Sequence, residues 1–180
     1  MKSLSILLLS LLVIACGQPN PQTPQAAEEI DWDALVPEEY SSDAIMVKYQ
    51  DKIEQMEDDT PEAEALYQKI MDEMANAPLN KKLDNKYIKL PGFIAPLSQQ
   101  NGRITEFLLV PYFGACIHVP PPPLNQTVLV KTAAGNGIWT EEVYEPIWVS
   151  GPITLEGKKT DIGEAGYLIA GATIEKYESY

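Results

Sequence analysis

The chain has 180 residues, of which 45% are hydrophobic, and its formal net charge at pH 7 is −13. This length can bury one modest hydrophobic core, and the acidic balance argues against nucleic acid or anionic lipid as a ligand. The segment from Ala26 to Asn76 contains 16 acidic and 3 basic side chains. Such a segment is most simply a solvated helix face, although it can also collect cations or bind a basic partner.

Residues 1–15 have the organisation of a secretory signal, with Lys2 before the apolar run Leu4–Ile14, which is too short to span a bilayer. The run VIACG that ends this segment resembles a bacterial lipobox, in which cleavage leaves a lipidated cysteine. We therefore expect Cys16 to carry the lipid anchor; a chance cysteine after an ordinary signal peptide is the alternative. Gly17 resembles the sorting pattern of lipoproteins of the outer membrane, so we expect the protein in the bacterial cell envelope, facing the periplasm.

Composition divides the rest of the chain. The segment after the signal is polar and proline-rich, which is typical of a disordered tether. The acidic segment that follows has helical periodicity, and the pattern changes to short strands at Lys86. We expect a signal peptide (1–15), a lipidated flexible tether (16–27), an acidic helical arm (28–85) and a β-barrel domain (86–180).

Two helices are predicted in the arm. The first is capped by Ser41, Ser42 or Asp43, and the pair Thr60-Pro61 begins the second. We expect both helices to pack against the outside of the barrel, and Trp32 to anchor the arm onto it. The residues expected to face inward are Met46, Tyr49, Ile53 and Met56 on the first helix, and Ala63, Leu66, Tyr67, Ile70 and Met74 on the second.

The second half of the chain is predicted to be mainly β. A Pro-Gly pair interrupts the first strand, Gly-Pro interrupts the fourth, and Asn101-Gly102 is a strong hairpin signal. Such kinks let a small sheet curl and close, so we predict a five-stranded, partly open barrel of the OB type, with a small β-sandwich as the alternative. The expected strands are residues 86–97, 104–111, 127–132, 146–155 and 166–177.

The densest chemistry lies in residues 107–126, which read FLLVPYFGACIHVPPPPLNQ. Cys116 and the only histidine, His118, are two residues apart, so they share one face of an extended segment. Thiolate and imidazole are ligands suited to zinc or copper, which makes this pair a candidate metal site. The pair supplies only two ligands, so a third must come from a carboxylate, a water or a partner, or less plausibly from Asn125 or Gln126.

Two other interpretations of the pair remain open. His118 can activate Cys116 as a nucleophile, with the backbone of Gly114 and Ala115 offering an oxyanion hole. Alternatively, Cys116 is a small buried hydrophobe and the imidazole is hydrogen-bonded in a loop. If Cys16 carries the lipid, Cys116 has no cysteine partner within the chain.

Four prolines follow the pair. Pro120, Pro121, Pro122 and Pro123 enforce a polyproline II conformation and offer a stiff apolar ridge. We predict that this ridge, with Tyr112 and Phe113 beside it, binds a partner protein. The alternative interpretation is that the four prolines serve only as a rigid spacer.

Five motifs stand out along the chain: DWDALVP, LPGFIAPL, the long central tract, WVSG and a final GY strand. Together, over about residues 31–180, they resemble an uncharacterised family of bacterial envelope proteins. Members of that family resemble companions of MacB-like ABC transporters linked to zinc limitation. The resemblance implies a lipid-anchored accessory protein of an envelope ABC transport system that handles zinc. A Cys-His thiol-dependent enzyme and a purely structural interaction module are the alternatives.

Overall fold

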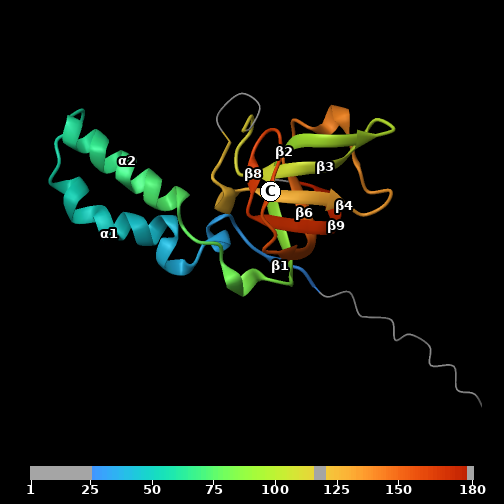
Figure 1. The fold of residues 1–180 in the computed structure, drawn as a ribbon, viewed down its shortest axis with the longest axis horizontal. Coiled ribbons are helices and arrows are strands. Elements are labelled where there is room, and N and C mark those ends of the chain that lie inside the picture. The colour runs from blue at the N-terminus through green and yellow to red at the C-terminus, as the bar shows by residue number, and fades with distance from the viewer. Residues whose placement is uncertain (1–25, 116–120, 178–180) are drawn as a thin grey trace, which may run out of the picture.

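The structure is a computed structural model that describes residues 26–115 and 121–177. It has two parts, a β-barrel and a helical hairpin that projects from it (Figure 1). The hairpin, residues 42–75, is the arm itself and is shorter than the segment 28–85 predicted from the sequence. The predicted signal peptide, Cys16, most of the tether, Cys116, His118 and Pro120 lie outside the described residues. No helix in the described part of the chain is long and apolar enough to cross a membrane.

Within the described residues, nine strands and two α-helices make up the two parts (Figure 1). The strands are β1 (Glu28–Glu29), β2 (Lys86–Gln100), β3 (Arg103–Val110), β4 (Val128–Thr132), β5 (Ile138–Trp139), β6 (Ile147–Thr154), β7 (Lys158–Lys159), β8 (Glu164–Ala165) and β9 (Tyr167–Lys176). The helices are α1 (Ser42–Glu54) and α2 (Pro61–Ala75), and five short 3-10 turns include η2 (Glu38–Tyr40) and η4 (Leu124–Gln126).

The five long strands form a closed barrel. Around the barrel the order is β2, β6, β9, β4, β3 and back to β2, because β2 pairs with both β6 and β3. Only the β4–β9 pair in this ring is parallel. Counted in chain order the ring reads 1-4-5-3-2, which is the strand order of an OB barrel. The predicted five-stranded OB-like barrel is therefore confirmed, and the ring is closed rather than partly open.

The predicted breaks are the points where strands bend. The stretch Lys86–Gly92 of β2 pairs with β6, and the stretch from Phe93 onward pairs with β3. A Cβ on Gly92 would lie 2.9 Å from the Val110 carbonyl oxygen, so only glycine lets β3 approach at this corner. Gly151 of β6 is under a similar constraint, because a Cβ there would lie 2.6 Å from a methyl group of the Ile169 side chain.

The barrel interior is filled by side chains from alternate positions of all five strands. β3 is buried on both faces, since Leu108 and Val110 pack in a second cluster outside the barrel. This explains why its sequence is a continuous apolar run rather than an alternating one. The interior side chains of the strands include Ile88, Leu90, Phe107, Leu109, Val128, Val130, Val149, Ile153, Tyr167 and Ile169.

The predicted helix starts are confirmed. The Ser41 hydroxyl accepts a hydrogen bond from the Ala44 N–H at 3.2 Å, and the Thr60 hydroxyl accepts one from Ala63 at the same distance. Pro61 occupies the first turn of α2, where a missing N–H costs nothing.

The predicted inward faces of the helices are partly wrong. Ile45 and Tyr49 are the buried side chains of α1, whereas Met46 is 48% exposed. On α2, Ile70 is buried and Tyr67 is 63% exposed. Both helices carry two neighbouring apolar stripes, and periodicity alone does not say which stripe meets the partner helix.

The expectation that the helices pack against the outside of the barrel is also wrong. The hairpin has a small core of its own, made of Ile45, Tyr49 and Ile70 with Leu66 and Met74 beside it. It extends away from the barrel and is joined to it only at its base (Figure 1).

Buried hydrogen bonds hold this base. The Tyr167 side chain is fully buried, and its hydroxyl donates to the Leu35 carbonyl, just before the arm. The N–H of Asn80, just after the arm, lies 2.6 Å from that hydroxyl and 3.1 Å from the same carbonyl. Trp32 anchors the arm as predicted, because its indole N–H donates to the Pro91 carbonyl at 2.9 Å. Both ends of the arm are thus fastened to the barrel.

The buried Tyr167 hydroxyl should make the stability of the fold depend on pH. Burial raises the pKa of this hydroxyl to about 12, although the Asn80 N–H opposes the shift. Because the folded state favours the neutral phenol, its stabilising effect is complete below pH 10 and is lost as the pH rises toward 12. The full effect is roughly 3 kcal/mol. We expect the free energy of unfolding, measured in urea, to fall more steeply between pH 10 and 12 in the wild type than in Tyr167→Phe. Parallel curves for the two proteins would contradict this account.

Candidate functional site: the groove between arm and barrel

The predicted interaction residues lie at the end of the barrel nearest the arm. Tyr112 and Phe113 follow β3 and are 45% and 53% exposed. Pro121 is exposed, Pro122 is buried and Pro123 is half-buried. The ridge predicted from the sequence is therefore only partly a surface, because Pro122 packs inward.

The proline segment is fixed at its C-terminal end. The Thr127 hydroxyl, which is buried, lies 3.1 Å from the Pro123 carbonyl and 3.4 Å from that of Pro122. Gly166 donates backbone hydrogen bonds to the carbonyls of Leu124 and Thr127, at 2.8 and 3.2 Å. These bonds hold the proline segment against the start of β9.

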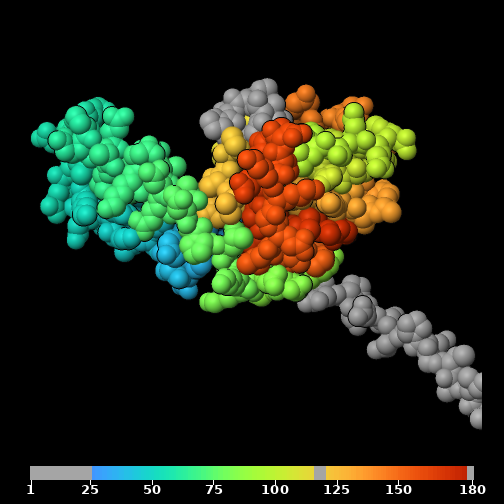
Figure 2. Space-filling view, viewed as in Figure 1, coloured from blue at the N-terminus to red at the C-terminus, as the bar shows by residue number. Residues whose placement is uncertain are grey.

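A groove separates this segment from the arm. Its volume is about 290 Å³, and its walls come from α2, from η2 and from the tract between β3 and β4. In Figure 2 the arm stands away from the barrel, with the proline segment along the barrel side of the gap. The side chains that give the groove its apolar character are Tyr40, Met71, Met74, Tyr112, Pro122 and Pro123.

Asn125 sets the position of the α2 wall. Its side chain is fully buried, and its Nδ2 donates to the carbonyls of Met74 and Ala77, at 3.0 and 2.9 Å. The Met74 carbonyl is in the last turn of α2, where no helical N–H remains to bond it, and Ala77 lies just after the helix. Its Oδ1 has no hydrogen-bond partner among the described residues.

Gln126 fastens the other side of the groove. Its Nε2 donates to the Trp32 carbonyl at 3.1 Å, so one short turn of the barrel holds both the segment before α1 and the end of α2. Asn125 and Gln126 were predicted from the sequence only as less plausible third ligands beside Cys116 and His118. The structure gives their amide nitrogens a different role, the attachment of the arm.

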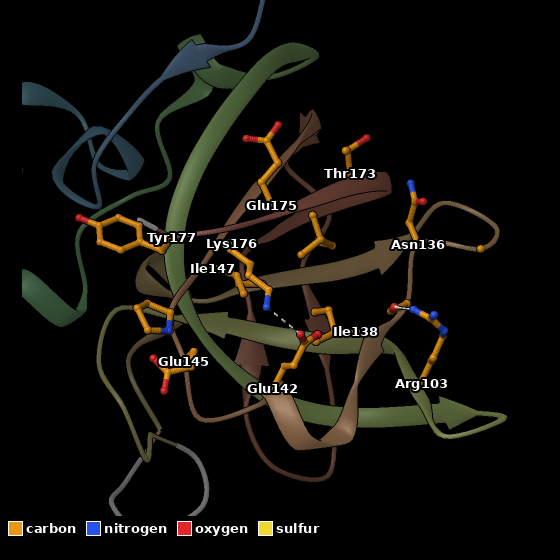
Figure 3. A pocket seen from close by; sticks show the side chains of 14 residues that line it. Arg103, Asn136, Ile138, Glu142, Glu145, Ile147, Thr173, Glu175, Lys176 and Tyr177 are labelled. Atoms are coloured by element: carbon orange, nitrogen blue, oxygen red, sulfur yellow. Dashed lines mark hydrogen bonds and ion pairs between the residues drawn. The ribbon is translucent and has the colours of Figure 1, made fainter. Parts of the chain in front are cut away.

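A second hollow lies at the opposite end of β3 (Figure 3). It has a volume of about 470 Å³, and Ile138, Ile147 and Ile174 contribute apolar lining. Lys176 and Glu142 form an ion pair of 3.1 Å beside them (Figure 3). Sequence reasoning missed this hollow, because it assembles the loop between β4 and β6 with the end of β9, and no motif marks it.

Most of the charged groups of this hollow already have partners. The Arg103 guanidinium donates to the Gly137 carbonyl at 2.7 Å and lies 3.7 Å from the centre of the Trp139 ring. Glu175 pairs with Lys89 at 2.7 Å. The rim carries both signs of charge, so it favours neither an anion nor a cation. The groove beside the arm is the better candidate site.

The molecule is thus a small OB-like barrel protein with a projecting helical arm and an apolar groove between the two. Residues 32–176 match the family described as "Protein of unknown function (DUF3299)", and the chain belongs to that family. It is similar to the crystal structure of a DUF3299 family protein from Pseudomonas aeruginosa PAO1, with 37% sequence identity and a TM-score of 0.60. That similarity covers 86% of this chain and 100% of the other. No curated protein matches the chain.

The attachment of the arm is tested by Asn125→Ala. This change removes two hydrogen bonds to carbonyls at the base of α2, which should cost about 1–3 kcal/mol of folding free energy. We expect a lower melting temperature and faster proteolytic cleavage between Met74 and Asn80. Gln68→Ala, on the exposed surface of α2, is the matched control and should change stability by less than about 0.5 kcal/mol. Equal cleavage rates in both variants would show that Asn125 does not hold the arm.

Proposed function

We propose that this protein is a lipid-anchored accessory protein of an envelope ABC transport system, and that it holds a partner protein in the groove between arm and barrel. The observation that supports this most is the groove itself, since its walls are fastened by buried hydrogen bonds from Asn125 and Tyr167. A preformed surface loses little conformational entropy on binding, which favours association with a partner.

The lining of the groove suits protein side chains. Aromatic residues and methionine are enriched at protein interfaces, and here Tyr40, Tyr112, Met71 and Met74 supply both. Its volume of about 290 Å³ is at the lower limit of small-molecule pockets, which is ~300 Å³. The size therefore favours one or two side chains of a partner over a whole small substrate.

The expected anchor places this surface close to the membrane. If Cys16 carries the lipid, eleven residues separate it from β1, which pairs with β2 of the barrel. At ~3.5 Å per residue, such a segment reaches at most about 40 Å. That reach would hold the groove within range of the envelope domains of a MacB-like transporter.

Co-purification from native envelopes tests the transport role. A tagged wild-type chain should retain the MacB-like transporter, and Tyr112→Ser combined with Pro123→Ser, both in the lining of the groove, should weaken retention about tenfold. Because both side chains are at least partly exposed, the melting temperature should change little. Trp139→Ser replaces an exposed aromatic at the opposite end of β3 and is the control. The proposal is wrong if the wild type and the control both fail to retain the transporter. It is also wrong if all three proteins retain it equally.

We further propose that the transport role includes zinc, bound by Cys116 and His118. The proposal rests on the sequence, since both residues lie outside the described part of the chain. Within the described part, no three His, Cys, Asp or Glu side chains come together to hold a metal ion. The remaining ligands would then be water or groups of a partner.

Metal analysis of the purified protein tests the zinc site. Cys116→Ser should abolish zinc binding, and His118→Ala should weaken it strongly, because a pair of ligands cannot lose one and retain affinity. Both variants should keep the circular dichroism spectrum of the wild type. Equal zinc content in all three proteins would rule the site out.

A further inference from the structure

The arm has an apolar face that the rest of the described chain leaves open. Met46 and Ile53 of α1 and Tyr67 and Met71 of α2 are 39–63% exposed. Successive helical residues are about 100° apart, so Met46 and Ile53 lie within roughly 20° of each other around α1. By the same geometry Tyr67 and Met71 lie within roughly 40° of each other around α2.

These two pairs lie on the same side of the hairpin. On α1, Met46 lies on one side of the buried Ile45, and Lys48 lies on the other. On α2, Met71 lies on one side of the buried Ile70, and Glu73 lies on the other. The ion pair between Lys48 and Glu73 shows which sides of the two antiparallel helices coincide. The hairpin therefore has one polar face, and its opposite face is apolar.

The lysines of the arm all gather away from the apolar face. Lys48, Lys52 and Lys69 lie around the ring of Tyr49, with their Nζ atoms 5.3, 5.8 and 5.9 Å from its centre. Between Ser42 and Ala75 the arm has ten acidic side chains and only these three bases. None of these three lysines thus borders the apolar face, whereas Glu64 lies on the same stripe as Tyr67 and Met71.

On the face of the arm that carries Lys48, the polar side chains bond to one another. Lys48 donates to Glu73, and the Tyr49 hydroxyl donates to the same carboxylate at 2.6 Å. These hydrogen bonds, that from Lys48 first, hold the pKa of Glu73 below its usual range. The polar face is satisfied within the arm, so a partner gains most on the opposite face.

The apolar face is continuous with the groove described above. Met71 belongs to both, since it also lines the groove beside Tyr112. The arm itself buries only Ile45, Tyr49 and Ile70, whereas short helices without tertiary packing are marginal in water. Covering the apolar face would therefore stabilise the arm as well as bind the partner.

We propose that this face binds a basic amphipathic helix of a partner protein, which packs across α1 and α2 to complete a three-helix bundle. The inference rests on the proposed function, because it gives the chemistry of the partner held at the groove. Two packed helices leave a shallow channel that a third helix fills with apolar side chains at i, i+3, i+4 and i+7. Cationic side chains on that helix complement the acidic arm, whereas an anionic membrane or a second copy of the arm is repelled.

Peptide binding tests the inference on the full mature chain carrying Cys16→Ser, which removes the lipid attachment point. The probes are two labelled amphipathic helices of about 18 residues, one of leucine and lysine and one of leucine and glutamate. We expect the lysine peptide to bind, more weakly as salt is added, and the glutamate peptide to bind at least about tenfold more weakly.

Variants locate the binding. Tyr67→Ser with Met71→Ser should weaken binding of the lysine peptide about tenfold. Val47→Ser should leave this binding unchanged, because the Val47 side chain is 72% exposed but lies off this face. Glu64→Lys should reduce the difference in affinity between the lysine peptide and the glutamate peptide. Circular dichroism should show equal helix content in all variants. Equal binding of both peptides, or full binding by the Tyr67/Met71 variant, overturns the inference.

Two outcomes separate this inference from the proposed function. Transporter retention in native envelopes without peptide binding at this face refutes the basic helix and leaves the accessory role standing. Binding of the lysine peptide, abolished by the Tyr67/Met71 variant, supports the face even if no transporter is retained. Self-association of the chain, or binding to anionic vesicles in place of the peptide, would assign the face to another occupant and refute the proposal.

Discussion

The buried hydroxyl of Tyr167 is the interaction on which the arrangement of the molecule depends. It lies at the start of β9 and joins the Leu35 carbonyl to the Asn80 N–H, which stand on either side of the arm in the sequence. Asn125 adds a second attachment, to the end of α2. Because an unpaired buried polar group costs about 1–3 kcal/mol, these bonds fix both ends of the arm against the barrel.

Such a fixed base explains how so small an arm can stand away from the barrel. The hairpin buries few side chains of its own, so its direction must come from its attachment rather than from packing along its length. The same attachment keeps Met71 and Tyr112 on opposite walls of one groove. The barrel thus serves as a support, and the surface best suited to bind a partner lies where the arm leaves it.

Much of the fold follows from local signals in the sequence. Pro91-Gly92 and Gly151-Pro152 set the bends of β2 and β6, and Thr60-Pro61 starts α2, because these residues act on their own backbone. The base of the arm could not be predicted in the same way. Asn125 contacts carbonyls about fifty residues away in the chain, and no local pattern distinguishes it from any loop asparagine. The open face was missed because methionines at helical spacing fit a core equally well.

The most direct test of a fixed arm is a distance measured in solution. Nitroxide labels at Glu62, on α2, and Lys159, on β7, both exposed, can be placed in a chain whose native Cys16 and Cys116 are replaced by serine. Double electron–electron resonance should then give one narrow distance distribution, as expected of an arm held by Tyr167 and its neighbours. A broad distribution would show that the arm swings freely, and would contradict a preformed groove.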